Sequence, residues 1–496
     1  MRTATKAQAL AMEDRVQRFS NYIGGVWTGA RAEALFDDIN PADTQDVVGR
    51  FPASSADEAG EAVHAAEHAF AEWRTLPISS RAKTLNRAAD HLEAHCEQYA
   101  REMTREMGKL LPLAKDEFLR SAQTLRFYAV EGQTLAGETF HNDDADMEVY
   151  TRREPLGVVS VITPWNFPVS IPARKIAPAL ITGNTVVFKP SSDAPLSGLC
   201  LVEAFAEAGI PKGVLNLITG SSSEVGRTIT TAPAVRAISF TGSTAAGEHI
   251  HRSVPFTTRT QMELGGKNPL IVMEDADLDK AVDLTIKGGL SLTGQACTGT
   301  SRVLVIKDVK DAFLRRLVAK VKALKIGNGL LPGIDIGPMA TARQLQTVLS
   351  YIEIGKREGT LLCGGERLSG PEYEHGYFVS PAIISDVQND ARIAREEIFG
   401  PVIAVIEAES YADAVAKANA SEYGLSAAIV TNNPRYMHAF VRDIESGTVK
   451  INRTTTGNLI NAPFGGLKRS STSTFREAGR TGLEFYTQIK TVYRGC

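Results

Sequence analysis

From residue 156 onward, short runs of β-branched and apolar residues alternate with stretches of helical character. This alternation is typical of a parallel β-sheet whose strands are connected by helices, and such layers commonly bind nucleotides. The predicted strands are 158–162, 185–188, 214–218 and 237–240, and the predicted helices between them lie near 169–182, 195–208 and 223–230.

A second series of the same kind follows. It contains strands at 269–272, 303–306 and 402–406 and helices near 278–290, 309–324 and 341–358. The chain has 496 residues, whereas a single hydrophobic core stops growing beyond roughly 250–300 residues. We therefore predict an α/β protein with two Rossmann-type, parallel-sheet domains.

Two further segments flank these units. Between 55 and 130 the apolar residues Leu85, Ala88, Leu92 and Tyr99 recur at helical spacing and predict surface helices. The alternating segment 147–154 (MEVYTRRE) predicts a hairpin strand with one exposed side. The tail 485–493 (FYTQIKTVY) also alternates, so it is a candidate to pair with that exposed strand.

Composition narrows the partners and the compartment. A net charge of -3 offers no broad basic surface for nucleic acid. Near the N-terminus, Arg2 and Lys6 are soon followed by Glu13 and no apolar signal core forms, while prolines break the uncharged run 155–173, which we expect to be a strand and a loop. We therefore expect no membrane association. The cysteines are few and far apart, which predicts no metal site and a reducing cytoplasm: Cys96, Cys200, Cys297, Cys363 and Cys496.

Cys297 is the candidate nucleophile. It lies in a glycine-flanked stretch, 294–300 (GQACTGT), between a predicted helix and a predicted strand. Such a turn can present backbone N–H groups that favour the thiolate and later an oxyanion. The alternative is a buried, inert cysteine, and the local sequence leaves both readings open.

Glu263 is the candidate base. It precedes two glycines and a strand start in 262–269 (MELGGKNP), and partial burial there would raise its pKa. A solvated loop glutamate is the alternative. His64, His68, His91 and His95 lie in charged helical surroundings, which gives little support to a Cys–His pair.

Two loops follow predicted strands. Asn166, in 164–168 (PWNFP), can donate its amide to an oxyanion or simply bond its own turn. Gly242 and Ser243, in 240–247 (FTGSTAAG), can offer free helix N–H groups to a pyrophosphate, although many such turns carry Gly and Ser merely as caps.

Taken together, these motifs and their order resemble the aldehyde dehydrogenase superfamily, from 22–25 (YIGG) to the tail. The resemblance implies aldehyde oxidation to a carboxylate with NAD or NADP, through a thiohemiacetal and thioester on Cys297. Glu263 would act as the base for thioester hydrolysis, and Asn166 with the Cys297 N–H would form the oxyanion hole. Lys175 and Glu477 match a proton-relay pair. The implied cofactor-binding residues are Trp165, Lys189, Ser192, Gly242, Ser243, Glu397 and Phe399.

Two positions depart from the commonest family pattern. Ser192 stands three residues after Lys189, where NAD-preferring relatives usually carry a glutamate. A serine does not repel a 2′-phosphate, so NADP should be accepted, and a preference for it stays open. Arg174 stands where many relatives have an aromatic residue, and in succinic semialdehyde dehydrogenases the matching arginine binds the substrate's distal carboxylate. The alternative is an arginine paired with a structural carboxylate.

Further motifs look still closer to α-ketoglutarate semialdehyde (2,5-dioxopentanoate) dehydrogenases. These are 295–302 (QACTGTSR), 452–453 and 462–468 (APFGGLK), and they make Arg453 a second candidate for binding the carboxylate. Succinic semialdehyde, or a broad set of aliphatic and aromatic aldehydes, is the alternative substrate. The rival functions are a thiol hydrolase or acyltransferase, and an inactive structural homologue.

The resemblance also divides the chain. It implies a cofactor-binding domain at 1–133 and 156–263, a catalytic domain at 264–454, and oligomerisation elements at 134–155 and 479–496 that form a β arm. A homodimer or homotetramer is expected.

Overall fold

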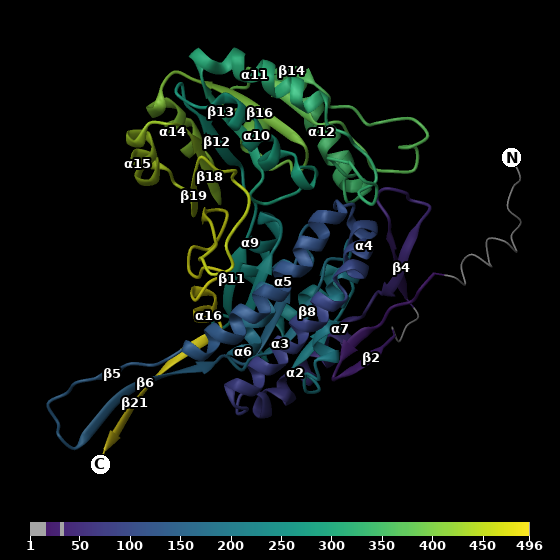
Figure 1. Cartoon of the computed structure of the whole chain (residues 1–496). Helices are drawn as coiled ribbons and strands as arrows, with labels where there is room; N and C mark the ends of the chain where they lie inside the picture. Colours follow the sequence, from purple (N-terminus) through teal and green to yellow (C-terminus); the bar gives the residue numbers. More distant parts are fainter. Residues whose placement is uncertain (1–15, 30–33, 496) are drawn as a thin grey trace, which may run out of the picture.

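The structure is a computed structural model that describes residues 16–29 and 34–495. Arg2, Lys6, Glu13 and Cys496 lie outside the described residues. Within them the chain forms two α/β units, drawn one above the other in Figure 1, and a long β arm. No helix of the described residues is long and apolar enough to cross a membrane.

The first unit is built on a seven-stranded sheet in the order β11-β10-β7-β8-β9-β1-β2. The five strands from β11 to β9 are parallel, whereas β1 and β2 are antiparallel additions at one edge. The strands are β1 (Asn21–Ile23), β2 (Val26–Thr28), β7 (Val158–Ile162), β8 (Thr185–Lys189), β9 (Leu215–Leu217), β10 (Val235–Thr241) and β11 (Arg259–Glu263).

The order of these strands fixes where a ligand can bind. The chain runs from β7 to β8 and β9 in one direction, but β10 returns to the other side of β7. Ligands bind outside the carboxyl ends of parallel strands where the strand order reverses in this way. The loop with Asn166 follows β7 and the turn at Gly242 follows β10, so both lie at this reversal.

Helices cover the first sheet, and the predicted helical segments are confirmed. Leu85 and Leu92 are completely buried, and they belong to the hydrophobic core of this unit. The run 155–173 was expected to be a strand and a loop. Its last residues instead belong to the helix α6, which begins at Ser170 and matches the helix predicted near 169–182. The helices are α2 (Ala56–Trp73), α3 (Ile78–Ala94), α4 (Cys96–Met107), α5 (Leu111–Glu131), α6 (Ser170–Ile181), α7 (Pro195–Glu207), α8 (Arg227–Thr231) and α9 (Thr244–Ser253).

The second unit has its own seven-stranded sheet, in the order β14-β15-β16-β13-β12-β18-β19. All neighbours are parallel except β14 and β15. Its strands are β12 (Asn268–Val272), β13 (Thr300–Ile306), β14 (Thr360–Cys363), β15 (Ala382–Ser385), β16 (Val402–Ala408), β18 (Ser426–Val430) and β19 (Thr448–Ile451). Its helices are α10 (Leu278–Gly289), α11 (Lys307–Lys322), α12 (Ala342–Glu358), α13 (Arg392–Arg395), α14 (Tyr411–Asn419) and α15 (Pro434–Asp443).

The predicted pairing between the hairpin and the tail is confirmed. β6 (Met147–Pro155) lies between β5 (Thr139–Phe140) and the C-terminal strand β21 (Thr487–Gly495), and it pairs with β21 along its whole length. These strands project from the body of the protein as an arm (Figure 1). Smaller elements complete the fold: β3 (Leu35–Ile39), β4 (Val47–Pro52), β17 (Tyr423–Gly424), β20 (Leu467–Lys468) and α16 (Thr481–Phe485).

Candidate active site

The loop that carries Cys297 joins the second unit's α10 to β13 through a strained turn. Leu292, Thr293 and Gly294 all have left-handed backbone, with φ of 54°, 55° and 69°. Such a conformation is unfavourable for a β-branched residue and costs on the order of 1–3 kcal/mol. The Thr293 hydroxyl donates to the carbonyl of Gly337 at 3.0 Å. At Gly294 an added Cβ would lie 2.2 Å from the carbonyl oxygen of Gly400, so only glycine fits.

Side-chain amides from three separate elements hold this loop in place. The Asn268 amide, at the start of β12, donates to the carbonyls of Cys297 at 2.8 Å and Gly299 at 2.9 Å. The Asn166 amide donates to the carbonyl of Gln295 at 2.9 Å, and the Gln295 side chain accepts from the backbone N–H of Ala340 at 2.9 Å. The structure therefore brings the Asn166 loop of the first unit onto the Cys297 loop of the second.

A buried ion pair that no sequence motif indicates supports the Asn166 loop. The Lys109 ammonium donates to the carbonyl of Asn166 at 2.9 Å and pairs with Glu117. The Glu117 carboxylate also accepts from the N–H groups of Val169 and Ser170, both at 3.0 Å, just where α6 begins. These contacts hold the loop between β7 and α6 in place.

Glu263 is the last residue of β11, and its carboxylate is completely buried. Among the described residues, neither of its oxygens has a hydrogen-bond partner. Burial raises its pKa well above the usual range, and the Glu477 carboxylate raises it further, although nearby cations such as Lys175 oppose the shift. Burial is therefore complete rather than partial as predicted, which leaves a carboxyl group with free lone pairs.

Lys175 and Glu477 form a buried pair beside Glu263. The Lys175 Nζ lies 3.6 Å from Glu477 Oε1, and both residues are at most 2% exposed. Burial lowers the pKa of Lys175, whereas the carboxylates of Glu477 and Glu263 oppose that change. Glu477 is held by two backbone hydrogen bonds to Phe464, of 2.6 and 2.7 Å. The structure thus brings the predicted relay residues together with the predicted base.

Arg174, the neighbour of Lys175 on α6, lies at the same place. Its guanidinium carbon is 5.7 Å from the centre of the Phe464 ring, and its Nε donates to the Ser170 carbonyl at 3.2 Å. The Phe464 cluster also contacts Cys297. Within residues 16–29 and 34–495 the guanidinium forms no ion pair, so the alternative of a structural carboxylate partner is not supported. Arg453, after β19, is exposed and likewise has no ion pair in the described chain.

The predicted phosphate and ribose residues lie at the carboxyl ends of the first sheet. Lys189 ends β8 and is 5% exposed, and burial lowers its pKa to about 8. Ser192 is exposed and donates to the carbonyl of Gly220 at 3.2 Å. Ser243 is the exposed N-cap of α9 and accepts from the N–H of Ala246 at 3.3 Å, directly after Gly242 and β10.

Glu397 and Phe399 of the second unit and Trp165 of the first unit lie where the two units meet. The N–H of Gly266 donates to Glu397 Oε1 at 3.0 Å, and burial raises the pKa of Glu397 to about 7. Phe399 has left-handed backbone, with φ of 57°, and its ring meets that of Trp165 edge-on at 5.4 Å. Trp165 of the first unit and Phe399 of the second are therefore in direct ring contact.

The ionisation of Cys297 is set by the groups around it. Cys297 is partly exposed, yet its surroundings raise the pKa of the thiol to about 12, first by burial and then through the carboxylates of Glu397, Glu263 and Glu477, against the Arg174 cation. These surroundings therefore disfavour the thiolate in the protein alone, as in the alternative of a buried cysteine. The loop N–H groups do not offset three nearby carboxyl groups, so the thiol needs a base or an additional positive charge to ionise.

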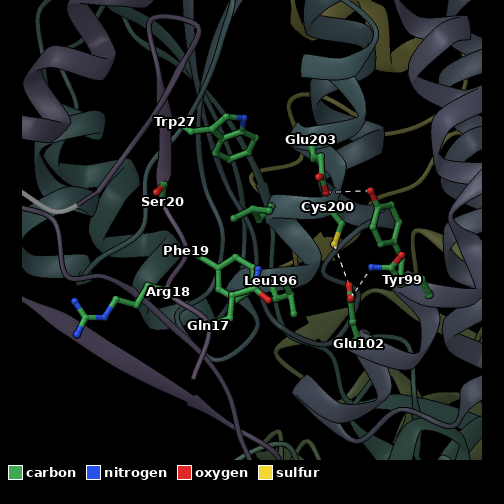
Figure 2. Close-up of a pocket in the computed structure, with 12 residues that line it drawn as sticks. Gln17, Arg18, Phe19, Ser20, Trp27, Tyr99, Glu102, Leu196, Cys200 and Glu203 are labelled. Atoms are coloured by element: carbon green, nitrogen blue, oxygen red, sulfur yellow. Dashed lines mark hydrogen bonds between the residues drawn. The ribbon is translucent and has the colours of Figure 1, made fainter. Parts of the chain in front are cut away.

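The remaining candidate groups lie elsewhere. A hollow of about 310 Å³ between the β1–β2 edge and helices α4 and α7 is lined by Trp27, Tyr99, Glu102, Cys200 and Glu203 (Figure 2), and none of the predicted site residues lines it. The pKa of its Cys200 thiol lies well above the usual range because of burial and acidic neighbours, which argues against a second nucleophile there. In the part of the chain that the structure describes, no three His, Cys, Asp or Glu side chains are grouped as metal ligands.

Comparison with known proteins gives one consistent result. Residues 27–492 match the model of the aldehyde dehydrogenase family. The chain is 44% identical to an α-ketoglutaric semialdehyde dehydrogenase of Bacillus subtilis over 96% of this chain and 98% of that protein. It is 43% identical to a 2,5-dioxopentanoate dehydrogenase of Saccharolobus solfataricus, over 95% and 98%. A betaine aldehyde dehydrogenase of Staphylococcus aureus, solved in complex with NAD⁺, superposes with a TM-score of 0.94 at 34% identity, over 99% of this chain and 97% of that one.

The chain therefore belongs to the aldehyde dehydrogenase family. It is an oxidoreductase that converts an aldehyde to a carboxylate, as the sequence predicted. The predicted fold of two α/β domains with a β arm is confirmed as well. Membership of this family goes against the first rival, a thiol hydrolase or acyltransferase.

Proposed function

We propose that this chain oxidises a semialdehyde that carries a second carboxylate, with α-ketoglutaric semialdehyde as the first substrate to test. The observation that carries this proposal is the Arg174 guanidinium, which lies against the Phe464 ring beside Cys297 without a carboxylate partner among the described residues. A planar guanidinium can bind a carboxylate through two parallel hydrogen bonds. The names of the two sequence relatives, which act on this semialdehyde, support the same choice.

The proposed chemistry begins at Cys297. Its thiol first gives its proton to solvent water, and the resulting thiolate attacks the aldehyde carbon. The new oxyanion accepts from the Cys297 N–H and from the Asn166 amide N–H that is not bonded to Gln295. After hydride departure the carbon is held as a thioester. Glu263 then takes a proton from a water molecule that attacks the thioester, which releases the carboxylate and a Cys297 thiolate, and the thiolate takes up a proton from solvent. The buried Lys175–Glu477 pair receives the proton that Glu263 has taken.

The residues present fit a nicotinamide dinucleotide. The N-terminus of the ten-residue helix α9 has an exposed N-cap after a strand end, which suits a pyrophosphate. The Lys189 ammonium is buried, and within the described residues its one hydrogen bond is to the Pro190 carbonyl at 3.3 Å, so it has donors left for a ribose. Glu397 would accept from the second ribose, and Trp165, Ser192, Gly242 and Phe399 would border the cofactor. When bound, the nicotinamide supplies the hydride acceptor and a positive ring.

The substrate proposal predicts the behaviour of Arg174→Ala. For carboxylate-bearing semialdehydes we expect KM to rise about 10-fold to 100-fold, since a hydrogen bond to a charged group contributes ~1.5–3 kcal/mol. For neutral aliphatic and aromatic aldehydes kcat/KM should stay within about twofold. Steady-state kinetics with α-ketoglutaric, succinic and glutaric semialdehydes beside neutral aldehydes measures both effects.

The matched variants are Arg174→Lys, which keeps the charge but loses the fork, and Arg453→Ala. If KM for the semialdehydes also rises in Arg453→Ala, both arginines bind the distal carboxylate of the substrate. An unchanged KM for all three semialdehydes in Arg174→Ala would overturn the proposal. If the wild type turns over succinic semialdehyde or neutral aldehydes better than α-ketoglutaric semialdehyde, the corresponding alternative substrate replaces it.

Cofactor choice is a separate prediction. We propose that NADP is accepted because Ser192 is exposed and uncharged beside Lys189. Ser192→Glu should lower kcat/KM for NADP by at least about fivefold relative to NAD, since a carboxylate near a 2′-phosphate repels it by ~1–4 kcal/mol. Ser192→Gln, which adds bulk without charge, is the control. A strong NAD preference of the wild type in steady-state kinetics would contradict this prediction.

We also propose that the arm formed by β5, β6 and β21 joins protomers into a homodimer or homotetramer. The arm carries exposed apolar side chains, with Phe140 46%, Ile489 59% and Tyr493 69% exposed. Such a row of exposed apolar residues is typical of an interaction surface. The proposed domains remain those of the sequence: cofactor binding at 1–133 and 156–263, catalysis at 264–454, and oligomerisation at 134–155 and 479–496. The free cysteines of the described chain support a place in a reducing cytoplasm.

A further inference from the structure

A chain of buried polar side chains continues from Lys175 on the side away from Glu477. The Lys175 ammonium donates to the Ser239 hydroxyl at 3.0 Å, and that hydroxyl donates to Gln261 Oε1 at 2.8 Å. The Gln261 Nε2 donates in turn to the carbonyl of Arg476 at 3.2 Å. Lys175, Ser239 and Gln261 are each at most 1% exposed. This series of hydrogen bonds therefore ends on Arg476, the residue directly before Glu477.

The direction of this chain is fixed by the groups themselves. A protonated lysine can only donate, and the Arg476 carbonyl can only accept, which orients the Gln261 amide with its oxygen toward Ser239. The Ser239 hydroxyl must then give its single proton to Gln261 and offer its lone pairs to Lys175. An acceptor in this position favours the charged form of Lys175 over the neutral form.

The geometry points to Ser239 and Gln261 as positioning residues for the Lys175 ammonium. We infer that they hold the ammonium in its charged state opposite Glu477. They thereby set the basic limit of thioester hydrolysis, which is the pH above which the hydrolysis rate falls. This inference rests on the proposed role of Lys175 and Glu477 in accepting the proton from Glu263. Neither Ser239 nor Gln261 contacts the substrate in this scheme, so both act through Lys175.

Other charged and titratable groups also surround Lys175. Arg174, on the same helix as Lys175, disfavours the charged form of Lys175. Glu477 and Glu263, from other segments, favour the charged form. The elements packed against α6 contribute two phenols, one further cation and the Glu117 carboxylate of α5, which pairs with Lys109 at the start of the helix. Tyr128 of α5 donates to the carbonyl of Gly479 at 3.3 Å, Tyr486 after α16 faces Ser239, and Arg81 of α3 donates to the carbonyl of Ile181 at the far end of the helix. Burial raises the pKa of both phenols, so they stay neutral at ordinary pH.

Ser239→Ala removes the acceptor and tests the inference. The hydrolysis of the acyl-enzyme is measured across pH by single-turnover quench, so that this step is observed whether or not it limits kcat. The Lys175 pKa should fall, and the basic limit of the hydrolysis rate should move to lower pH by about one unit. The NADPH or NADH burst should keep its amplitude and KM should stay unchanged, because Cys297 and the substrate site are untouched.

Matched variants separate this effect from a loss of folding. Ser239→Thr keeps the hydroxyl and should restore the wild-type pH profile, while Gln261→Leu should give a smaller shift in the same direction. Ser160→Ala is the control: Ser160 is also completely buried, lies on the neighbouring strand β7 and bonds to Ile229 instead. It should leave the profile unchanged.

Lys175→Met distinguishes failure of the inference from failure of the proposed relay. If Lys175→Met leaves hydrolysis and its pH profile unchanged, the relay itself is wrong. If Lys175→Met slows hydrolysis but Ser239→Ala leaves the basic limit in place, the relay stands and the inference is overturned. If both variants act, the Ser239→Ala effect should vanish in the Lys175→Met background, because the two residues act through the same ammonium.

Discussion

Replacing Cys297 with alanine should abolish formation of NADH or NADPH with every aldehyde while the protein stays folded. The thiol is the proposed nucleophile, and the other described cysteines, Cys96, Cys200 and Cys363, are buried. Loss of a nucleophile that forms the covalent intermediate lowers the rate by about 10⁴-fold or more. Absorbance at the reduced-nicotinamide band measures it with saturating aldehyde and either cofactor.

The fold should tolerate this change because backbone contacts hold the loop. Asn268 bonds the Cys297 carbonyl, and Gln295 and Thr293 bond their own partners without the sulfur. The melting temperature of Cys297→Ala should therefore stay close to that of the wild type. Cys363→Ala, in an edge strand of the second unit, is the matched control and should retain activity. Appreciable turnover by Cys297→Ala would refute the covalent mechanism.

The predictable part of the fold is the part with a strong apolar pattern. β7 and β8 are almost entirely buried, so their β-branched runs stand out in the sequence. β11 escaped prediction because its residues, RTQME, include three polar or charged side chains that the folded protein buries. Those side chains are buried for a chemical reason, since Gln261 and Glu263 belong to the polar groups around Lys175. A hydrophobic pattern cannot reveal a strand of this kind.

The active site likewise has a part that the sequence predicts and a part that only the folded structure reveals. The motifs identified residues whose types and neighbours suit a reaction, and the structure brings Cys297, Glu263, Asn166 and Lys175 to one place. Contacts between distant segments were invisible: Asn268 to Cys297, Lys109 to Asn166, and Lys175 to Ser239. The raised pKa of Cys297 was invisible for the same reason, because it comes from burial and from carboxylates that only the folded chain brings near the sulfur.

The second large effect is expected at Glu263. Glu263→Gln should keep the initial burst of NADH or NADPH, since thiol attack and hydride departure do not need this carboxylate in the proposed scheme. Steady-state turnover should fall by about 10²-fold to 10⁴-fold, the usual contribution of a general base. The thioester should accumulate, and acid quench followed by mass measurement of the protein would detect it. A variant that turns over normally, or one without a burst, would contradict the assigned role.

The pH dependence gives an independent test. The pKa of Glu263 is raised in the folded protein, so the wild type should lose thioester hydrolysis as pH falls through that raised pKa, and Glu263→Gln should lack this acidic limit. Glu203→Gln is the control, because Glu203 accepts a hydrogen bond from Tyr99 at 3.0 Å outside the site and should leave turnover unchanged (Figure 2).

Stability should change in the opposite direction to activity. A carboxyl group whose pKa is raised by folding stabilises the protein fully only below its unfolded pKa, and that contribution is lost as pH rises through the folded pKa. At a pH above that raised pKa the wild type therefore carries a buried carboxylate whose oxygens have no hydrogen-bond partner among the described residues. Glu263→Gln removes that charge, so its free energy of unfolding at alkaline pH should equal or exceed that of the wild type. A variant that is both inactive and markedly less stable would indicate a structural role for Glu263 instead of a catalytic one.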